Sequence, residues 1–163
     1  MEDQLIPRFF DKAMIEQAYP IVRTLVPGVT LERWVQFARP RIASRSPEWP
    51  HGLMAIQHPS GYILGLFAFE VRDDLHESRT LWISNIVIPD IPGRGQIGKS
   101  IIKAGEHLAM IHGCHAIRAE LNNEIDPSDC DRTWLSASLV ISGYSLGGVR
   151  AFKRITSNFP GTH

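Results

Sequence analysis

A glycine-rich segment flanked by cations is the part of this sequence whose residue types and spacing most clearly suggest chemistry. It follows a strand-like run and is expected to lead into a helix from about Lys99 to His112. Unpaired N–H groups at the positive end of a helix bind phosphate, and glycines let the phosphate approach the backbone. The segment therefore predicts a phosphate site lined by Gly93, Arg94, Gly95, Gln96, Ile97, Gly98, Lys99 and Ser100.

Three interpretations of this segment are open. Residues 93–100 match the nucleotide-binding P-loop motif G-x-x-x-x-G-K-[ST] at every fixed position. Against a P-loop, the strand expected after the helix runs into Asn122 and Asn123, and not into an aspartate that would hold magnesium. The second interpretation is a glycine-rich turn between a strand and a helix, with no ligand. The third is a pyrophosphate loop of another kind.

The third interpretation comes from a resemblance to the GNAT (N-acetyltransferase) superfamily, whose loop has the pattern [QR]-x-x-G-x-[GA]. Residues 87–90, Val-Ile-Pro-Asp, look like that family's V-x-P-[DE] lead-in, and residues 142–149 resemble its L-G-F-x-x-x-G-x ending. The order of the expected elements also matches over nearly the whole chain. The loop departs from the pattern, because Gly93 stands at the [QR] position and Gln96 at the middle glycine, with Arg94 one residue away.

The resemblance implies direct transfer of an acetyl group from acetyl-CoA to a small-molecule or peptide amine. CoA would lie between two strands that splay apart. Main-chain groups of Ile86, Val87 and Ile88 would hold the acetyl carbonyl and the pantetheine arm, and Asn122 lies where the family often places a polar group against the pantetheine. The alternative is a domain with the same fold that binds CoA, as a sensor or regulator, without turnover.

Acetyl transfer needs a base for the ammonium group of the acceptor and tolerates or protonates the leaving thiolate. Leu139 occupies the position where many family members have a catalytic tyrosine, so Tyr144 is the candidate acid. The candidates for the base are Asn85, which follows Ser84 in the third central strand, and Glu120 in the next strand. Either Ser84 or Asn85 would act by holding a water.

Positioning these groups requires a sheet with helices packed on it. Hydrophobic periodicity and turn residues predict strands at Ile6–Phe10, Gly52–His58, Tyr62–Val71, Thr80–Ile88, His115–Leu121 and within Ser145–Ile155. They predict helices at Lys12–Leu25, from the cap Thr30 through Ala38, at Lys99–His112 and at Arg132–Ile141. The expected fold class is α/β (α+β), with a central mixed, mostly antiparallel sheet flanked by helices, as in the GNAT acyltransferase fold.

The composition indicates one domain over residues 1–163 in a cytoplasmic protein. The 17 lysines and arginines balance the 17 aspartates and glutamates, which argues against a nucleic-acid partner. No apolar run reaches the roughly 20 residues that cross a membrane, and the histidines show no metal-binding spacing. A C-terminal strand edge makes a homodimer possible. An acidic run is expected to attract a cationic amine: Glu124, Asp126, Asp129 and Asp131.

Overall fold

The computed structural model describes residues 4–43, 48–120, 139, 142–145 and 153. Its strands are β1 (Ile6–Phe9), β2 (His51–Gln57), β3 (Ile63–Asp74), β4 (Ser78–Val87) and β5 (Ala116–Ala119). Its helices are α1 (Lys12–Leu25), α2 (Leu31–Ala43) and α3 (Arg94–Ile111). The strands form one sheet in the order β1-β2-β3-β4-β5, antiparallel except for the parallel pair β4 and β5. This confirms the predicted mixed, mostly antiparallel sheet.

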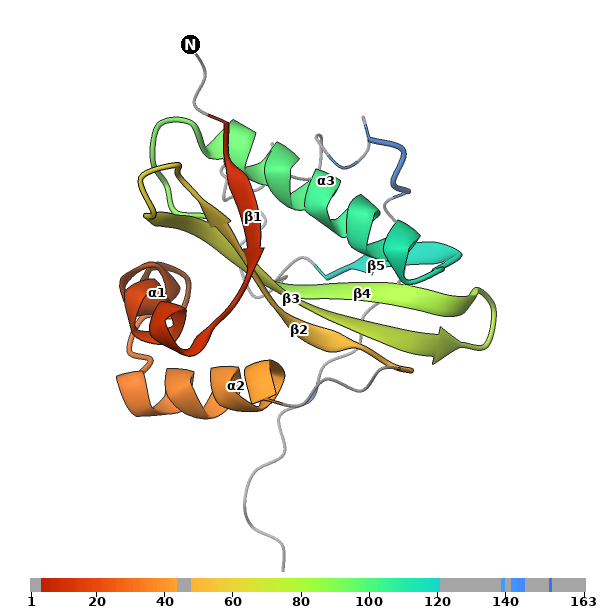
Figure 1. Cartoon of the computed structure of the whole chain (residues 1–163), viewed down its shortest axis with the longest axis horizontal. Helices are drawn as coiled ribbons and strands as arrows, with labels where there is room; N and C mark the ends of the chain where they lie inside the picture. Colours follow the sequence, from red (N-terminus) through yellow and green to blue (C-terminus); the bar gives the residue numbers. More distant parts are fainter. Residues whose placement is uncertain (1–3, 44–47, 121–138, 140–141, 146–152, 154–163) are drawn as a thin grey trace, which may run out of the picture.

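The helices divide between the two faces of the sheet. In Figure 1, α1 and α2 lie together below the sheet, and α3 runs across its upper face. The connection from β4 through α3 to β5 is the crossover that a parallel pair of strands requires. The N-terminus of α3 therefore follows directly from the carboxyl end of β4.

Each face of the sheet has its own hydrophobic core. Trp34 of α2 and Met14 and Ile15 of α1 pack with Leu53 and Ala68 of the sheet on one side. On the other side, residues of α3 pack against β3 and β4, and this core includes Phe67, Leu81, Ile83, Ile97 and Leu108. Fully burying a side chain of this kind contributes roughly 1.5–3 kcal/mol. The two cores fix both layers of helices to the sheet.

Two glycines bring α3 unusually close to the sheet. A Cβ atom at Gly65 of β3 would lie 2.7 Å from Cγ2 of Ile97 and 3.2 Å from the carbonyl oxygen of Val87. A Cβ atom at Gly105 of α3 would lie 2.5 Å from Cδ1 of Ile83. Real Cβ atoms do not approach so closely, so the glycines are required for this packing. They allow the first turn of α3, at Ile97, and a later turn, at Gly105, to lie close against β3 and β4.

The elements expected after Leu121 fall almost entirely outside the described residues. Leu139 is helical, Gly143 has the left-handed φ of 93°, and the N–H of Tyr144 donates to the carbonyl of Leu139 at 3.0 Å. Such a glycine with a bond back over the last turn is a common C-terminal cap. These features agree with a helix end at Gly143, while the predicted helix Arg132–Ile141 lies outside the described residues except for Leu139, and the predicted strands within Ser145–Ile155 stay a prediction.

Candidate active site

The sheet is irregular at Asn85 of β4. Ser84 pairs with Ala68 and Val87 pairs with Leu66, so β4 has one more residue than β3 between these pairs. Asn85 takes up this extra residue in a left-handed conformation with φ of 51°, which asparagine tolerates better than most residues. A bulge of this kind bends its strand and interrupts regular pairing. β4 therefore changes course at Asn85.

The strands β4 and β5 stop pairing immediately before this bulge. Their last aligned pair is Ile83 with Ala119, and the N–H of Glu120 donates to the carbonyl of Ile83 at 2.7 Å. Beyond that bond, β4 continues through Ile86 and Val87. Within residues 4–43 and 48–120, no strand pairs with this stretch on its β5 side. Main-chain groups of this stretch are thus placed at a parting between two strands, where the sequence predicts the acetyl and pantetheine contacts.

The register brings the candidate bases together. Glu120 stands next to Ser84 across the β4–β5 pair, one position beyond Ile83 and Ala119. Since side chains alternate along a strand and Ile83 faces α3, Ser84 and Glu120 belong to the face that carries α1 and α2. Asn85 is exposed, and its Nδ2 donates to Oγ of Ser84 at 3.2 Å. Ser84, Asn85 and Glu120 therefore occupy neighbouring backbone positions where β4 and β5 separate.

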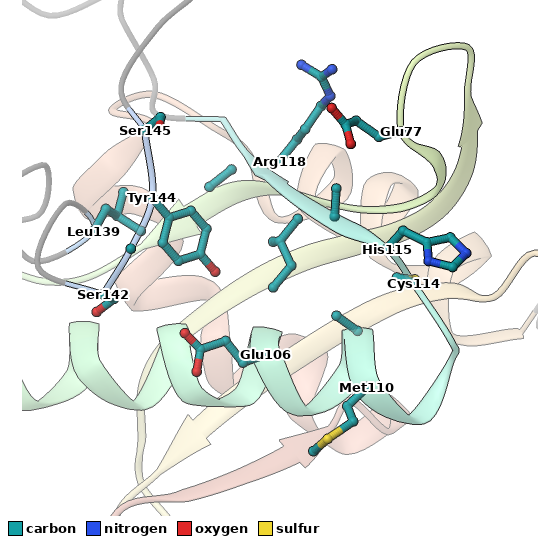
Figure 2. A pocket seen from close by; sticks show the side chains of 15 residues that line it. Glu77, Glu106, Met110, Cys114, His115, Arg118, Leu139, Ser142, Tyr144 and Ser145 are labelled. Carbon is teal, nitrogen blue, oxygen red and sulfur yellow. The ribbon is translucent and has the colours of Figure 1, made fainter.

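Tyr144 lies on the opposite side of the sheet, in a pocket of about 820 Å³ between α3 and β5. In Figure 2, its hydroxyl and the carboxylate of Glu106 both point into the space between these elements. Burial raises the pKa of the Tyr144 phenol above its usual 10.0, and the negative charge of Glu106 adds a smaller increase. The phenol is therefore protonated at neutral pH and able to donate a proton.

The glycine-rich segment differs from its predicted form. We expected a loop up to Gly98 and a helix from about Lys99, but α3 begins at Arg94 with Gly93 as its N-cap at φ of 88°. Gly93 accepts from the N–H groups of Gln96 at 2.9 Å and Ile97 at 3.3 Å, so these amides are already paired. The predicted helix start is wrong because glycines at 95 and 98 do not prevent a helix whose inner face is well packed.

The side chains of the segment divide between core and surface. Ile97 and Gly98 are buried in the inner face of α3, whereas Gly93, Gly95, Gln96 and Lys99 are exposed. Within the described residues, no acceptor is shown for the N–H groups of Gly93 and Gly95, and a Cβ atom at either position would meet open space. The part of the segment able to face an anion is thus the turn at 93–96, and not Gly98.

Arg94 forms an ion pair with a neighbouring carboxylate. Its Nη1 lies 2.8 Å from Oδ1 of Asp90, in a pair that is largely open to solvent on the Asp90 side. Exposed pairs of this kind contribute about 0–1 kcal/mol, so a phosphate that bound at the turn would compete readily for the guanidinium. Ser100 is half-buried in the second turn of α3. Ile88 is half-buried just after β4, and Asn122 lies outside the described residues.

Sequence reasoning missed two parts of this region. Glu106 meets Tyr144 only through the fold, and no local pattern signals such a pair. The alternation along β4 does indicate that Trp82 shares a face with Ser84. The residues of β3 and β5 that lie beside Trp82 could not be predicted, because they depend on the register between the strands. Among the described residues, no group of three or more His, Cys, Asp or Glu side chains could hold a metal, and no helix is long and apolar enough to cross a membrane.

The layers, the strand order, the bulge and the parting of β4 from β5 together define the GNAT acyltransferase fold, and this chain has that fold. The aminoglycoside N-acetyltransferase AAC(6')-Iy, solved with CoA, is similar with a TM-score of 0.72 and 16% identity, over 95% of this chain and 97% of that chain. AAC(6')-Ih from Acinetobacter baumannii is similar with a TM-score of 0.67 and 13% identity, over 94% and 100% of the two chains.

Glucosamine-6-phosphate N-acetyltransferase from Arabidopsis thaliana is a further similar structure, with a TM-score of 0.61 and 14% identity. The likeness covers 92% of this chain and 99% of that one. No protein-family model matches the sequence, and no curated protein matches it. Because all three identities are low, the likeness concerns the fold, and the activity of this chain has to be argued from its own residues.

Proposed function

We propose that this protein is an acetyl-CoA-dependent N-acetyltransferase that transfers the acetyl group directly to an amine. The observation that supports it most is the parting of β4 from β5 after Ile83, beside the bulge at Asn85. There, main-chain groups of Ile86 and Val87 would bind the acetyl carbonyl and the pantetheine arm. The turn at Gly93 and Gly95 would take the pyrophosphate at the N-terminus of α3.

The two faces of the sheet would serve the two reactants. The amine would approach from the side of α1 and α2, where Glu120 or a water held by Ser84 and Asn85 accepts its proton. The amine nitrogen then attacks the thioester carbon, and the C–S bond breaks as the thiolate leaves. Tyr144, whose phenol is protonated on the α3 side, would give the thiolate a proton. A leaving thiolate needs little acid help, so a variant at Tyr144 should retain part of the activity.

Isothermal titration with acetyl-CoA and ATP, followed by thiol release with a panel of amines, tests the proposal. We expect acetyl-CoA to bind, ATP not to bind, and at least one amine to raise the rate of thiol release. Binding of ATP would favour the P-loop interpretation. Tight binding of acetyl-CoA with no turnover for any amine would identify a CoA-binding module and overturn the enzymatic proposal.

A further inference from the structure

An aromatic ring with two arginines over it lies beside the candidate active site. The guanidinium carbon of Arg72 on β3 is 4.7 Å from the ring centre of Trp82 on β4, and that of Arg118 on β5 is 5.5 Å from it. Their neighbours Leu81 and Ile117 pack toward α3, so these three side chains belong to the α1–α2 face. Figure 2 shows Arg118 pointing away from α3. We call Arg72, Trp82 and Arg118 the arginine–tryptophan cluster.

The two cations of this cluster are partly paired and well exposed. Nη2 of Arg72 lies 2.8 Å from Oε2 of Glu70, and Nε of Arg118 lies 3.4 Å from Oδ2 of Asp74. The side chains of Arg72 and Arg118 are 48% and 45% exposed. A guanidinium has five N–H donors in a planar fork, so a single carboxylate contact leaves it able to hold another anion. Arg72 reaches the Trp82 ring from β3 and Arg118 reaches it from β5, on the other side of β4, so a carboxylate or phosphate beside this ring would have a guanidinium group on either side.

The indole of Trp82 adds a donor without a partner. Its Nε1 is buried and makes no hydrogen bond within the part of the chain that the structure describes. Buried donors are nearly always paired, and an unpaired one calls for an explanation. Both guanidinium groups lie over this ring, so an anion that they bind would be held close to the indole. An anionic oxygen would then satisfy that donor.

The cluster stands one row of the sheet away from the candidate bases. Trp82 precedes Ser84 by two residues on β4, and Arg118 precedes Glu120 by two on β5. Two residues along a strand span about 7 Å. A molecule held by the cluster would therefore place a group about 7 Å away beside Ser84 and Glu120, at the parting of the strands.

We infer that the acceptor is an amine that also carries a carboxylate or phosphate, which Arg72 and Arg118 bind while the amine lies beside Ser84 and Glu120. This inference rests on the proposed acetyltransferase function. It differs from the sequence-based expectation of a cationic acceptor, which depended on an acidic run outside the described residues. A polycationic acceptor would find no anionic partner in either arginine, and the carboxylates of Glu70 and Asp74 are already paired with them.

The first experiment detects the anion without turnover. In a ¹H–¹⁵N correlation spectrum, Trp82→Phe assigns the Trp82 indole peak, and the Trp34 indole, which donates to the carbonyl of Ile15 at 2.6 Å, is an internal reference. We expect inorganic phosphate or acetate to shift the Trp82 peak and leave the Trp34 peak in place. The shift should be lost in the Arg72→Gln/Arg118→Gln double variant. A Trp82 peak that does not respond to either anion would contradict the inference.

The second experiment measures acetyl transfer with matched acceptors. Glucosamine 6-phosphate is compared with glucosamine, 5-aminopentanoate with pentylamine, and kanamycin is the polycation. For the preferred anionic acceptor, we expect a kcat/KM at least about tenfold higher than that of the matched amine without the phosphate or carboxylate. Arg118→Gln should raise KM for that acceptor about tenfold with KM for acetyl-CoA unchanged, whereas Arg8→Gln, on the distant strand β1, should change neither.

The outcomes separate the inference from the function on which it rests. The phosphate and carboxylate pairs show which anion the cluster prefers. An anion-dependent Trp82 shift with no acetyl transfer to any amine would keep the anion site and overturn the acetyltransferase proposal. Efficient transfer to kanamycin, with no preference for either anionic acceptor, would keep the function and overturn the inference.

Discussion

A carboxylate placed at Gly95 should weaken acetyl-CoA binding while leaving the fold at least as stable. Gly95 is exposed in the first turn of α3, and a Cβ atom there meets nothing within 4 Å. In Gly95→Asp the carboxylate would lie about 5 Å from a phosphate at this turn. Two like charges at that distance repel by about 1–3 kcal/mol at effective dielectric constants between those of water and a protein surface. The dissociation constant should therefore rise about 5- to 150-fold.

The same substitution should act on stability in the opposite direction. Aspartate has a better helix propensity than glycine, and a negative charge in the first turn interacts favourably with the helix dipole. We expect Gly95→Asp to raise the free energy of unfolding by about 0.5–1 kcal/mol. Lost binding in a more stable protein cannot be attributed to unfolding.

Gly95→Asn is the matched control, because it has the same shape without the charge. Titration calorimetry at low and high salt should give a large difference in affinity between the two variants that narrows as salt screens the repulsion. Equal affinities for the Asp and Asn variants at low salt would refute a pyrophosphate seat at this turn. A substitution at Gly98 is a poorer test, since Gly98 is buried and a carboxylate there would disturb the packing.

Three further predictions concern the framework of the site. Gly65→Ala should lower stability by about 1–3 kcal/mol in urea unfolding, because its Cβ would overlap Ile97; an unchanged midpoint would contradict the close packing of α3. Trp34→Phe should lower stability by about 1–3 kcal/mol, because the buried hydrogen bond from the indole to the carbonyl of Ile15 is lost. Burial, and to a smaller extent the charge of Arg79, lower the pKa of His112 below 6.5 in the folded protein. As the pH falls through 6.5, His112 is therefore protonated in the unfolded chain before it is protonated in the folded one, and the free energy of unfolding decreases. His112→Gln should flatten that slope in thermal unfolding at pH 5–7.

The elements that the sequence predicts well are those whose signals are local. The residues from Lys12 to Leu25 have helical spacing of apolar side chains, and Asp11 caps the helix by accepting from the N–H of Met14 at 3.0 Å. The predicted bounds of α1 are confirmed. The β2–β3 hairpin also follows from two apolar runs on either side of a Pro-Ser-Gly turn. Neither prediction needs information from distant residues.

The start of α3 could not be predicted because distant contacts decide it. Glycines 93, 95 and 98 have low helix propensity, so the local sequence predicts a loop. Ile97, however, packs against Gly65 and belongs to the core that α3 shares with the sheet. Burial of that side chain stabilises a helix through a segment with poor intrinsic propensity. The arginine–tryptophan cluster has the same origin, because its members come from three strands whose register no local pattern determines.

The topology explains how chains with little sequence in common can have the same fold around the end of β4. β4 and β5 are parallel, so the crossover through α3 must begin at the carboxyl end of β4, where a helix N-terminus then stands. The bulge at Asn85 parts the two strands at that same end. The proposed seat for an anion and the proposed gap for its attached arm would thus lie at the same end of β4, and backbone groups would form most of both. In the function proposed for this chain, side chains on the α1–α2 face, such as Arg72 and Arg118, would select the acceptor.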